Sequence, residues 1–180
     1  MKKTLALLAL SVFLFASCSK DDVDELPPAT QTGANTFGAK LDGGLWVPRQ
    51  FSLGTGTILE ARLNGTNGFF INARDFSSSP TEKEFEIYIA SMTGPGTYLL
   101  NQNTSRFPYQ SASYGYYLIR KFMPLNEWLT SSQFTGRVDI TKFDQAAKIV
   151  SGTFEFTAGS VDSTASPITV SEGRFDVIYQ

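Results

Sequence analysis

Two acidic residues of this sequence have the types and spacing that acid–base chemistry needs. Glu84 and Glu86 lie two positions apart in an alternating stretch, so on a strand they share one face at a spacing of about 6.6 Å. Glycoside hydrolysis uses a pair of carboxylates roughly 5–9.5 Å apart. However, Lys83 adjoins the pair, and apolar Phe85 and Ile87 alternate with it. We therefore expect both acids to lie on the solvent-exposed face of a sheet and to have no catalytic role.

The composition removes most other classes of catalytic site. The chain has no histidine, the commonest general base and the commonest zinc ligand. Its one cysteine, Cys18, is expected to be acylated, which leaves no thiol nucleophile. No calcium-binding loop of the Asp-x-Asp-x-Asp-Gly type and no glycine-rich phosphate loop is present. We expect no catalytic residue, no metal site and no cofactor, with a carboxylate-only hydrolase as a remote alternative.

An aromatic, amide-rich stretch is the best indication of binding. Residues 101–113 read as a long loop that begins with three amide side chains at 101–103. Sugar rings have flat apolar faces edged by hydroxyls, so aromatic rings beside amides suit them, and exposed aromatics also suit protein partners. The alternative is that alternate tyrosines face the core. The candidate ligand-binding residues are Arg106, Phe107, Tyr109 and Tyr114.

A short motif suggests a modification site. Asp162-Ser163-Thr164 lies in a loop rich in Ser, Thr and Pro. It resembles the O-glycosylation sequon of Bacteroidota envelope proteins, with Ser163 as the acceptor. The alternative is a plain solvated loop.

The N-terminal residues have the pattern of a targeting signal. Lys2 and Lys3 precede an apolar stretch over 5–15 and small residues before Cys18, the three parts of a secretory signal. Its end resembles a bacterial lipobox, which implies that Cys18 is lipidated and becomes the mature N-terminus. We therefore expect a signal peptide over 1–17 and a membrane contact made by acyl chains alone.

The residues after Cys18 read as a tether. They are acidic, then proline-containing and polar, so we expect a disordered linker over 18–35. Ser19-Lys20-Asp21-Asp22 resembles the surface-export signal of Bacteroidota lipoproteins, which implies an outer-membrane protein exposed at the cell surface. With 15 basic and 17 acidic residues there is no basic stripe, so we expect no nucleic-acid partner.

The remaining residues, 36–180, show period-two patterning throughout, which predicts a single antiparallel β domain. A sandwich and a closed barrel both fit, and a closed barrel would favour a small-molecule or lipid carrier. Asp42-Gly43 predicts a tight hairpin turn, and 124–129 could form one helical turn. The expected strands are 37–41, 45–47, 57–63, 68–74, 84–91, 97–100, 114–122, 136–143, 148–158 and 168–179.

Several of these stretches together resemble an uncharacterised family of Bacteroidota lipoproteins, known as a domain of unknown function. They are Asp42-Gly43-Gly44-Leu45-Trp46 and the segments 136–144, 150–158 (with GTFEFTA) and 171–177 (with EGRFDV). The resemblance implies a location in the cell envelope and a β fold, but it implies neither a reaction nor functional residues. We expect an envelope-anchored, non-catalytic domain that binds or scaffolds, as an accessory to glycan or nutrient capture. The membrane and a glycan or envelope protein are its expected partners.

Overall fold

Alternating apolar residues and tight turns give eleven strands in the computed structural model, which describes residues 25–50, 56–78, 80–121 and 126–180. All paired strands are antiparallel, as the period-two pattern predicts. None of these described residues forms a helix long and apolar enough to cross a membrane. The strands are β1 (Thr36–Leu41), β2 (Gly44–Trp46), β3 (Leu59–Asn64), β4 (Gly68–Ser78), β5 (Thr81–Ile89), β6 (Gly96–Leu100), β7 (Tyr114–Arg120), β8 (Asn126–Leu129), β9 (Gly136–Asp144), β10 (Ile149–Ser160) and β11 (Ile168–Ile178).

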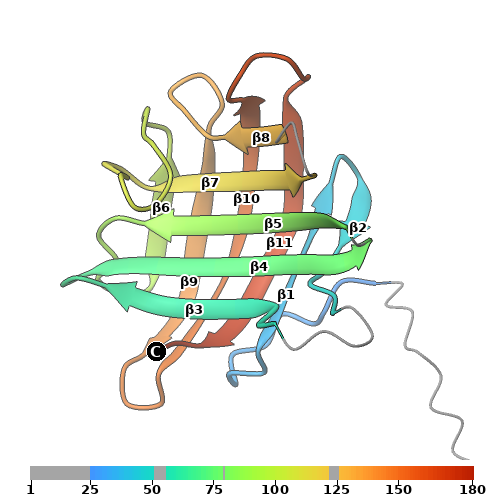
Figure 1. The fold of residues 1–180 in the computed structure, drawn as a ribbon. Coiled ribbons are helices and arrows are strands. Elements are labelled where there is room, and N and C mark those ends of the chain that lie inside the picture. The colour runs from blue at the N-terminus through green and yellow to red at the C-terminus, as the bar shows by residue number, and fades with distance from the viewer. Residues whose placement is uncertain (1–24, 51–55, 79, 122–125) are drawn as a thin grey trace, which may run out of the picture.

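The strands form two layers that cross each other (Figure 1). The front layer has the order β3-β4-β5-β7-β8, and the back layer contains β2, β1, β11, β10, β9 and β6. Strand β10 pairs with β9 and β11 along most of its length and then with β8 through Gly159 and Ser160. The two layers are therefore one sheet that folds at β10, and over the described residues its strand order does not close on itself.

Aromatic side chains fill the space between the layers. The ring of Phe85 on β5 lies 4.6 Å from that of Trp46 and 5.9 Å from that of Phe37. Phe37 in turn packs at 5.1 Å against Phe154 of β10. Since each of these side chains is at most 5% exposed, the interior is a packed aromatic core.

The turns explain where the hairpins form. Asp42 and Gly43 have φ values of 48° and 83°, and they join β1 to β2 as the sequence predicts. The helical turn predicted over 124–129 is wrong for the part that the structure describes, because Asn126–Leu129 pairs with β7 as β8. Trp128, whose spacing suggested a helix, instead faces the core, and its indole N–H donates to the Ser166 carbonyl at 2.9 Å.

The free edge of the front layer is partly bridged. Gln180 exchanges two backbone hydrogen bonds with Ala61 and Leu63 of β3, at 3.0 and 3.3 Å. At the other end, Arg49 pairs with the last part of β4. Between these two bridges lies a cavity of about 730 Å³, walled mainly by apolar side chains that include Val47, Ile58 and Ile178. We call it the seam cavity.

Part of the expected linker is ordered. Residues 25–35 lie on the outer face of the back layer, and Asp176 of β11 accepts hydrogen bonds from residues 30, 32, 33 and 34. The prediction of a disordered linker over 18–35 is therefore wrong for residues 25–35, because a buried carboxylate supplies the bonding partner that their composition does not reveal. The expected signal peptide over 1–17 and Cys18 lie outside the described residues.

Candidate binding site

The outer face of the front layer carries an unusual set of charged and aromatic side chains. Strand β5 places Glu82, Glu84, Glu86 and Tyr88 on this face, since alternate residues of a strand point the same way. In the register of the sheet, Glu86 lies between Asn72 of β4 and a tyrosine of β7. The orientation agrees with the sequence pattern. The expected solvent exposure does not, because Glu84 and Glu86 are each only 3% exposed.

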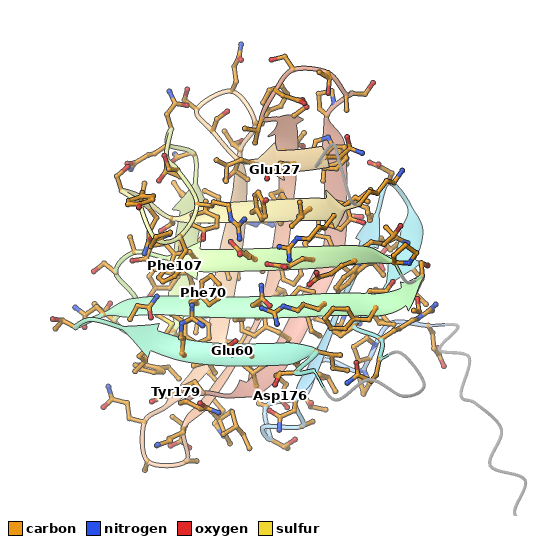
Figure 2. All side chains as sticks on the ribbon, in the orientation of Figure 1. Glu60, Phe70, Phe107, Glu127, Asp176 and Tyr179 are labelled. Atoms are coloured by element: carbon orange, nitrogen blue, oxygen red, sulfur yellow. The ribbon has the colours of Figure 1, made fainter. Side chains whose placement is uncertain are left out.

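A second apolar cluster lies outside the main core, on this outer face. It consists of Phe70, Tyr88, Tyr114, Tyr116 and Leu118. The loop of residues 101–113 folds over part of it, and Figure 2 shows Phe107 beside Phe70 at one end of the front layer. Their ring centroids are 5.8 Å apart. The loop therefore has an apolar surface to pack on.

The guanidinium group of Arg62 extends this cluster. It lies 4.2 Å from the centroid of the Phe70 ring and 5.2 Å from that of Phe107. Both distances are within the range of a cation–π contact. Arg62 on β3 therefore helps to hold the loop residue Phe107 against the sheet.

Glu86 connects the loop to the sheet at two adjacent loop residues. The Arg106 guanidinium donates to Glu86 Oε1 at 2.6 Å, and the Tyr114 hydroxyl donates to Glu86 Oε2 at 3.1 Å. The Tyr114 oxygen in turn accepts the backbone N–H of Phe107 at 3.0 Å. The hydrogen bond from the Arg106 guanidinium to the Glu86 carboxylate is charge-assisted, so it is stronger than a hydrogen bond between neutral groups. We call this set of contacts the Glu86 anchor.

The titration of these groups fits a buried network. Burial raises the pKa of Glu86, the hydrogen bond from Arg106 opposes the rise, and the neighbouring Glu84 adds to it. Burial and the charge of Glu86 also raise the pKa of Tyr114, so its hydroxyl keeps its proton and remains a donor. The two side chains therefore hold complementary roles as acceptor and donor.

Glu84 is surrounded by donors. The Asn72 amide donates to its Oε1 at 2.7 Å. Three guanidinium groups stand further off, at 3.7–3.8 Å, from Arg74, Arg106 and Arg120. With cations around both acids and almost no exposure, the arrangement is typical of a structural ion-pair network rather than of an acid–base pair open to a substrate.

The loop is also fixed from within. The Thr104 hydroxyl oxygen accepts the backbone N–H groups of Ser111 and Ala112, at 2.9 and 3.2 Å. Asn103 Oδ1 accepts the N–H of Ser132 at 3.1 Å, which ties the loop to the segment before β9. These bonds leave the tip of the loop projecting into solvent. Tyr109 is 83% exposed and Phe107 is 40% exposed.

The structure brings the candidate ligand-binding residues together but gives them different places. Arg106, Phe107 and Tyr109 are neighbours in the loop, with Tyr109 outermost. Tyr114 is completely buried beneath the loop, so the idea that its ring faces a ligand is wrong in this arrangement. The physical reason is that its hydroxyl is committed to Glu86 and to the Phe107 amide.

Sequence reasoning missed Glu86 as a functional residue. The alternating pattern placed it correctly on the outer face, but the partner that covers it, Arg106, is twenty positions away. The only signal was the row of three alternate glutamates, 82, 84 and 86, beside two tyrosines on β7. Such a row needs cations, and the loop contains one.

The candidate modification site at Ser163 lies in an exposed turn. Ser163 is exposed in a turn in which Asp162 accepts bonds from Ser160 and Thr164. These bonds lower the pKa of Asp162 to about 2. Within the described ranges, no group of three or more acidic or cysteine side chains is arranged to hold a metal ion.

Comparison with known proteins places this domain in a family. No curated protein and no solved structure matches the chain. A family model described as a domain of unknown function, DUF6252, matches residues 34–178, which include every strand described above. The chain therefore belongs to the DUF6252 family.

Proposed function

We propose that this protein is an envelope-anchored lipoprotein whose β domain has no catalytic role and binds a glycan or an envelope protein through the tip of loop 101–113. The observation that supports the proposal most directly is the exposure of Tyr109 on a loop that is fixed from below by the Glu86 anchor. A rigid exposed ring loses little conformational entropy when a partner binds.

The chemistry around the tip suits a saccharide. Phe107 adds apolar surface beside Tyr109, and the exposed side chains at 101–103 supply amide donors and acceptors. Arg106 is partly exposed as well, and its guanidinium can donate to hydroxyl or carboxylate oxygens that lie over the loop. Arg106 is in the same turn as Tyr109, whose backbone N–H donates to the Arg106 carbonyl at 3.1 Å, so a sugar ring stacked on Tyr109 would have a cationic donor nearby.

A glycan array tests this proposal. The mature chain, purified in detergent, is applied to immobilised plant, mucosal and bacterial oligosaccharides. We expect binding to one class of glycan, and Tyr109→Ala should abolish it. Leu99→Ala is the matched control, because Leu99 is 58% exposed but lies on β6 outside the loop. Equal binding by both variants would contradict the proposed site.

The envelope address rests on the sequence before the domain. A charged start, an apolar stretch and small residues before the only cysteine support lipidation at Cys18. Metabolic labelling with radioactive palmitate should mark the wild-type protein and leave Cys18→Ala unmarked. Mature protein that begins upstream of Cys18 would contradict the lipid anchor.

The seam cavity favours a second candidate function, binding of a small apolar molecule. Its volume of about 730 Å³ lies in the range of ligand sites. A fluorescent apolar dye should bind there, and Ile58→Arg should abolish its fluorescence enhancement. Dye binding that survives Ile58→Arg would remove this candidate.

A further inference from the structure

Residues 25–35 cross the outer face of the back layer and are held there along their length. Pro27 packs against Gly38 of β1, where an added Cβ would lie 2.7 Å from the proline ring. Further on, Gly33 has a φ of +74°, and an added Cβ would lie 2.9 Å from Ile178. The Lys142 ammonium group donates to the Gln31 carbonyl at 2.9 Å. We call this segment the strap.

Asp176 is the centre of these contacts. It is 1% exposed and lies between β1 and β10, opposite Thr36 and Ser151. Its carboxylate accepts the backbone N–H groups of residues 32, 33 and 34 at 2.8–3.1 Å. The hydroxyls of Thr30 and Ser151 donate to it at 2.6 and 2.7 Å.

These donors also determine the charge of Asp176. Burial alone would raise its pKa, but the hydrogen bonds from Thr30, Ser151 and the strap amides hold the pKa far below the usual range. The carboxylate is therefore ionised under ordinary conditions, and ionised acceptors make the stronger hydrogen bonds.

From these contacts we propose that the strap shortens the lipid tether, so that the domain stays close to the bilayer with loop 101–113 turned away from the lipid. The proposal rests on the lipid anchor at Cys18. Whatever path residues 19–24 take, the seven residues from Cys18 to Glu25 span at most about 25 Å. With the strap released, the eighteen residues to Thr36 could span about 60 Å.

The position of the loop makes this difference matter. Figure 2 labels Phe107 towards the left end of the front layer, whereas the described part of the chain begins, in blue in Figure 1, beyond the right end of that layer. Strand β4 alone has eleven residues, which corresponds to a length on the order of 35 Å. A tether of about 25 Å is too short for the domain to turn over and bring the loop to its own membrane.

Hydrogen exchange tests the strap itself. The amides of residues 32–34 should exchange about 100-fold more slowly than in an unstructured peptide, and Asp176→Asn should remove this protection. Gly33→Ala is the second variant, because the φ of +74° and the 2.9 Å approach to Ile178 both disfavour a side chain at this position, while Asp176 itself is kept. Unprotected amides in the wild-type chain would overturn the proposal.

Energy transfer tests the distance from the membrane. Gln102→Cys places a dye on an exposed loop position, and the one native cysteine, Cys18, would be blocked by the lipid on which this proposal rests. The protein is reconstituted in vesicles of phosphatidylethanolamine and phosphatidylglycerol with acceptor dyes on the headgroups. We expect little transfer in the wild-type chain and more in Asp176→Asn and Gly33→Ala. Asp162→Asn, which lies in a remote turn, should behave like the wild type.

The two proposals fail in different ways. Protein that does not float with the vesicles has no lipid anchor, and the spacing role then falls with the anchor. Protein that floats but shows the same transfer with and without the strap variants overturns the spacing role and leaves the lipid anchor intact.

Discussion

Glu86 and Arg106 form the ion pair that joins loop 101–113 to the sheet. Burial raises the pKa of Glu86, so the folded protein favours the protonated acid more than the unfolded chain does. This group therefore costs stability as the pH rises above its unfolded pKa, near 4.5, through its folded pKa. Arg106 offsets that cost by supplying a cation at 2.6 Å.

We expect Arg106→Ala to lower the free energy of unfolding by about 2 kcal/mol at pH 7, because a buried carboxylate loses its main donor. The loss should shrink towards pH 4, where Glu86 is protonated in the folded state. Urea unfolding at both pH values measures this. The double variant with Glu86→Gln should show no such pH dependence, and a loss that grows on acidification would contradict the assignment.

Truncation of two tyrosines in the candidate site should affect the stability of the protein to very different extents. Tyr114 is completely buried, so Tyr114→Ala should cost about 3–5 kcal/mol of stability. Tyr109 is 83% exposed, and Tyr109→Ala should change stability by less than about 0.5 kcal/mol. Thermal unfolding compares them directly. A large destabilisation by Tyr109→Ala would mean that its ring is part of the packing rather than a free binding surface.

At the scale of elements, β9, β10 and β11 fit together only because glycines leave room for the phenylalanines of β10. Gly136 of β9 pairs with Phe156, and a Cβ at Gly136 would lie 2.2 Å from the Phe156 Cβ and 2.5 Å from the Glu155 carbonyl oxygen. Backbone atoms of a central strand cannot move aside easily. The close pairing of these strands therefore depends on the glycine.

Gly136→Ala should destabilise the protein by about 1–3 kcal/mol through overpacking. Gly44→Ala is the matched control, because its nearest contact would be at 3.4 Å and its φ is not in the left-handed region. Differential scanning calorimetry of the two variants checks the prediction. Equal melting temperatures would show that β9 can shift to accept a side chain.

At the scale of the whole molecule, Asp176 joins the strap to the domain, and its low pKa makes the joint sensitive to acid. A carboxyl pKa below the unfolded value contributes stability above about pH 3.9, and that contribution is lost as the pH falls through the folded pKa. Asp176→Asn should therefore cost about 2 kcal/mol at pH 7, and the difference from the wild type should narrow below pH 4. Acid unfolding of both proteins, followed by circular dichroism, tests whether their difference in stability narrows as the pH falls.

The sequence predicts most of the strands and their two faces, but not which loops and terminal segments pack on those faces. Alternation correctly assigns Phe85 and Ile87 to the core and Glu84 and Glu86 to the outer face, because strand periodicity is local. The short β8 was misread because four residues hold too little pattern to tell strand from helix. The candidate ligand-binding residues Arg106, Phe107 and Tyr109 were chosen from the composition of their segment alone, and the structure places them together in one loop.

The remaining features depend on contacts between distant residues. Thr30 and Asp176 are 146 positions apart, and no pattern in a polar, proline-containing segment announces that a buried carboxylate will order it. The same holds for Arg106 and Glu86. A single sequence gives the faces of strands, whereas the loops that cover those faces follow from tertiary packing.

The measurement that tests the central claim most directly is hydrogen exchange at the Phe107 amide, which donates to Tyr114 above Glu86. If the Glu86 anchor fixes loop 101–113, this amide exchanges about 100-fold more slowly than in an unstructured peptide. The protection should be lost in Arg106→Ala and kept in Tyr109→Ala. Free exchange in the wild-type protein would contradict the account.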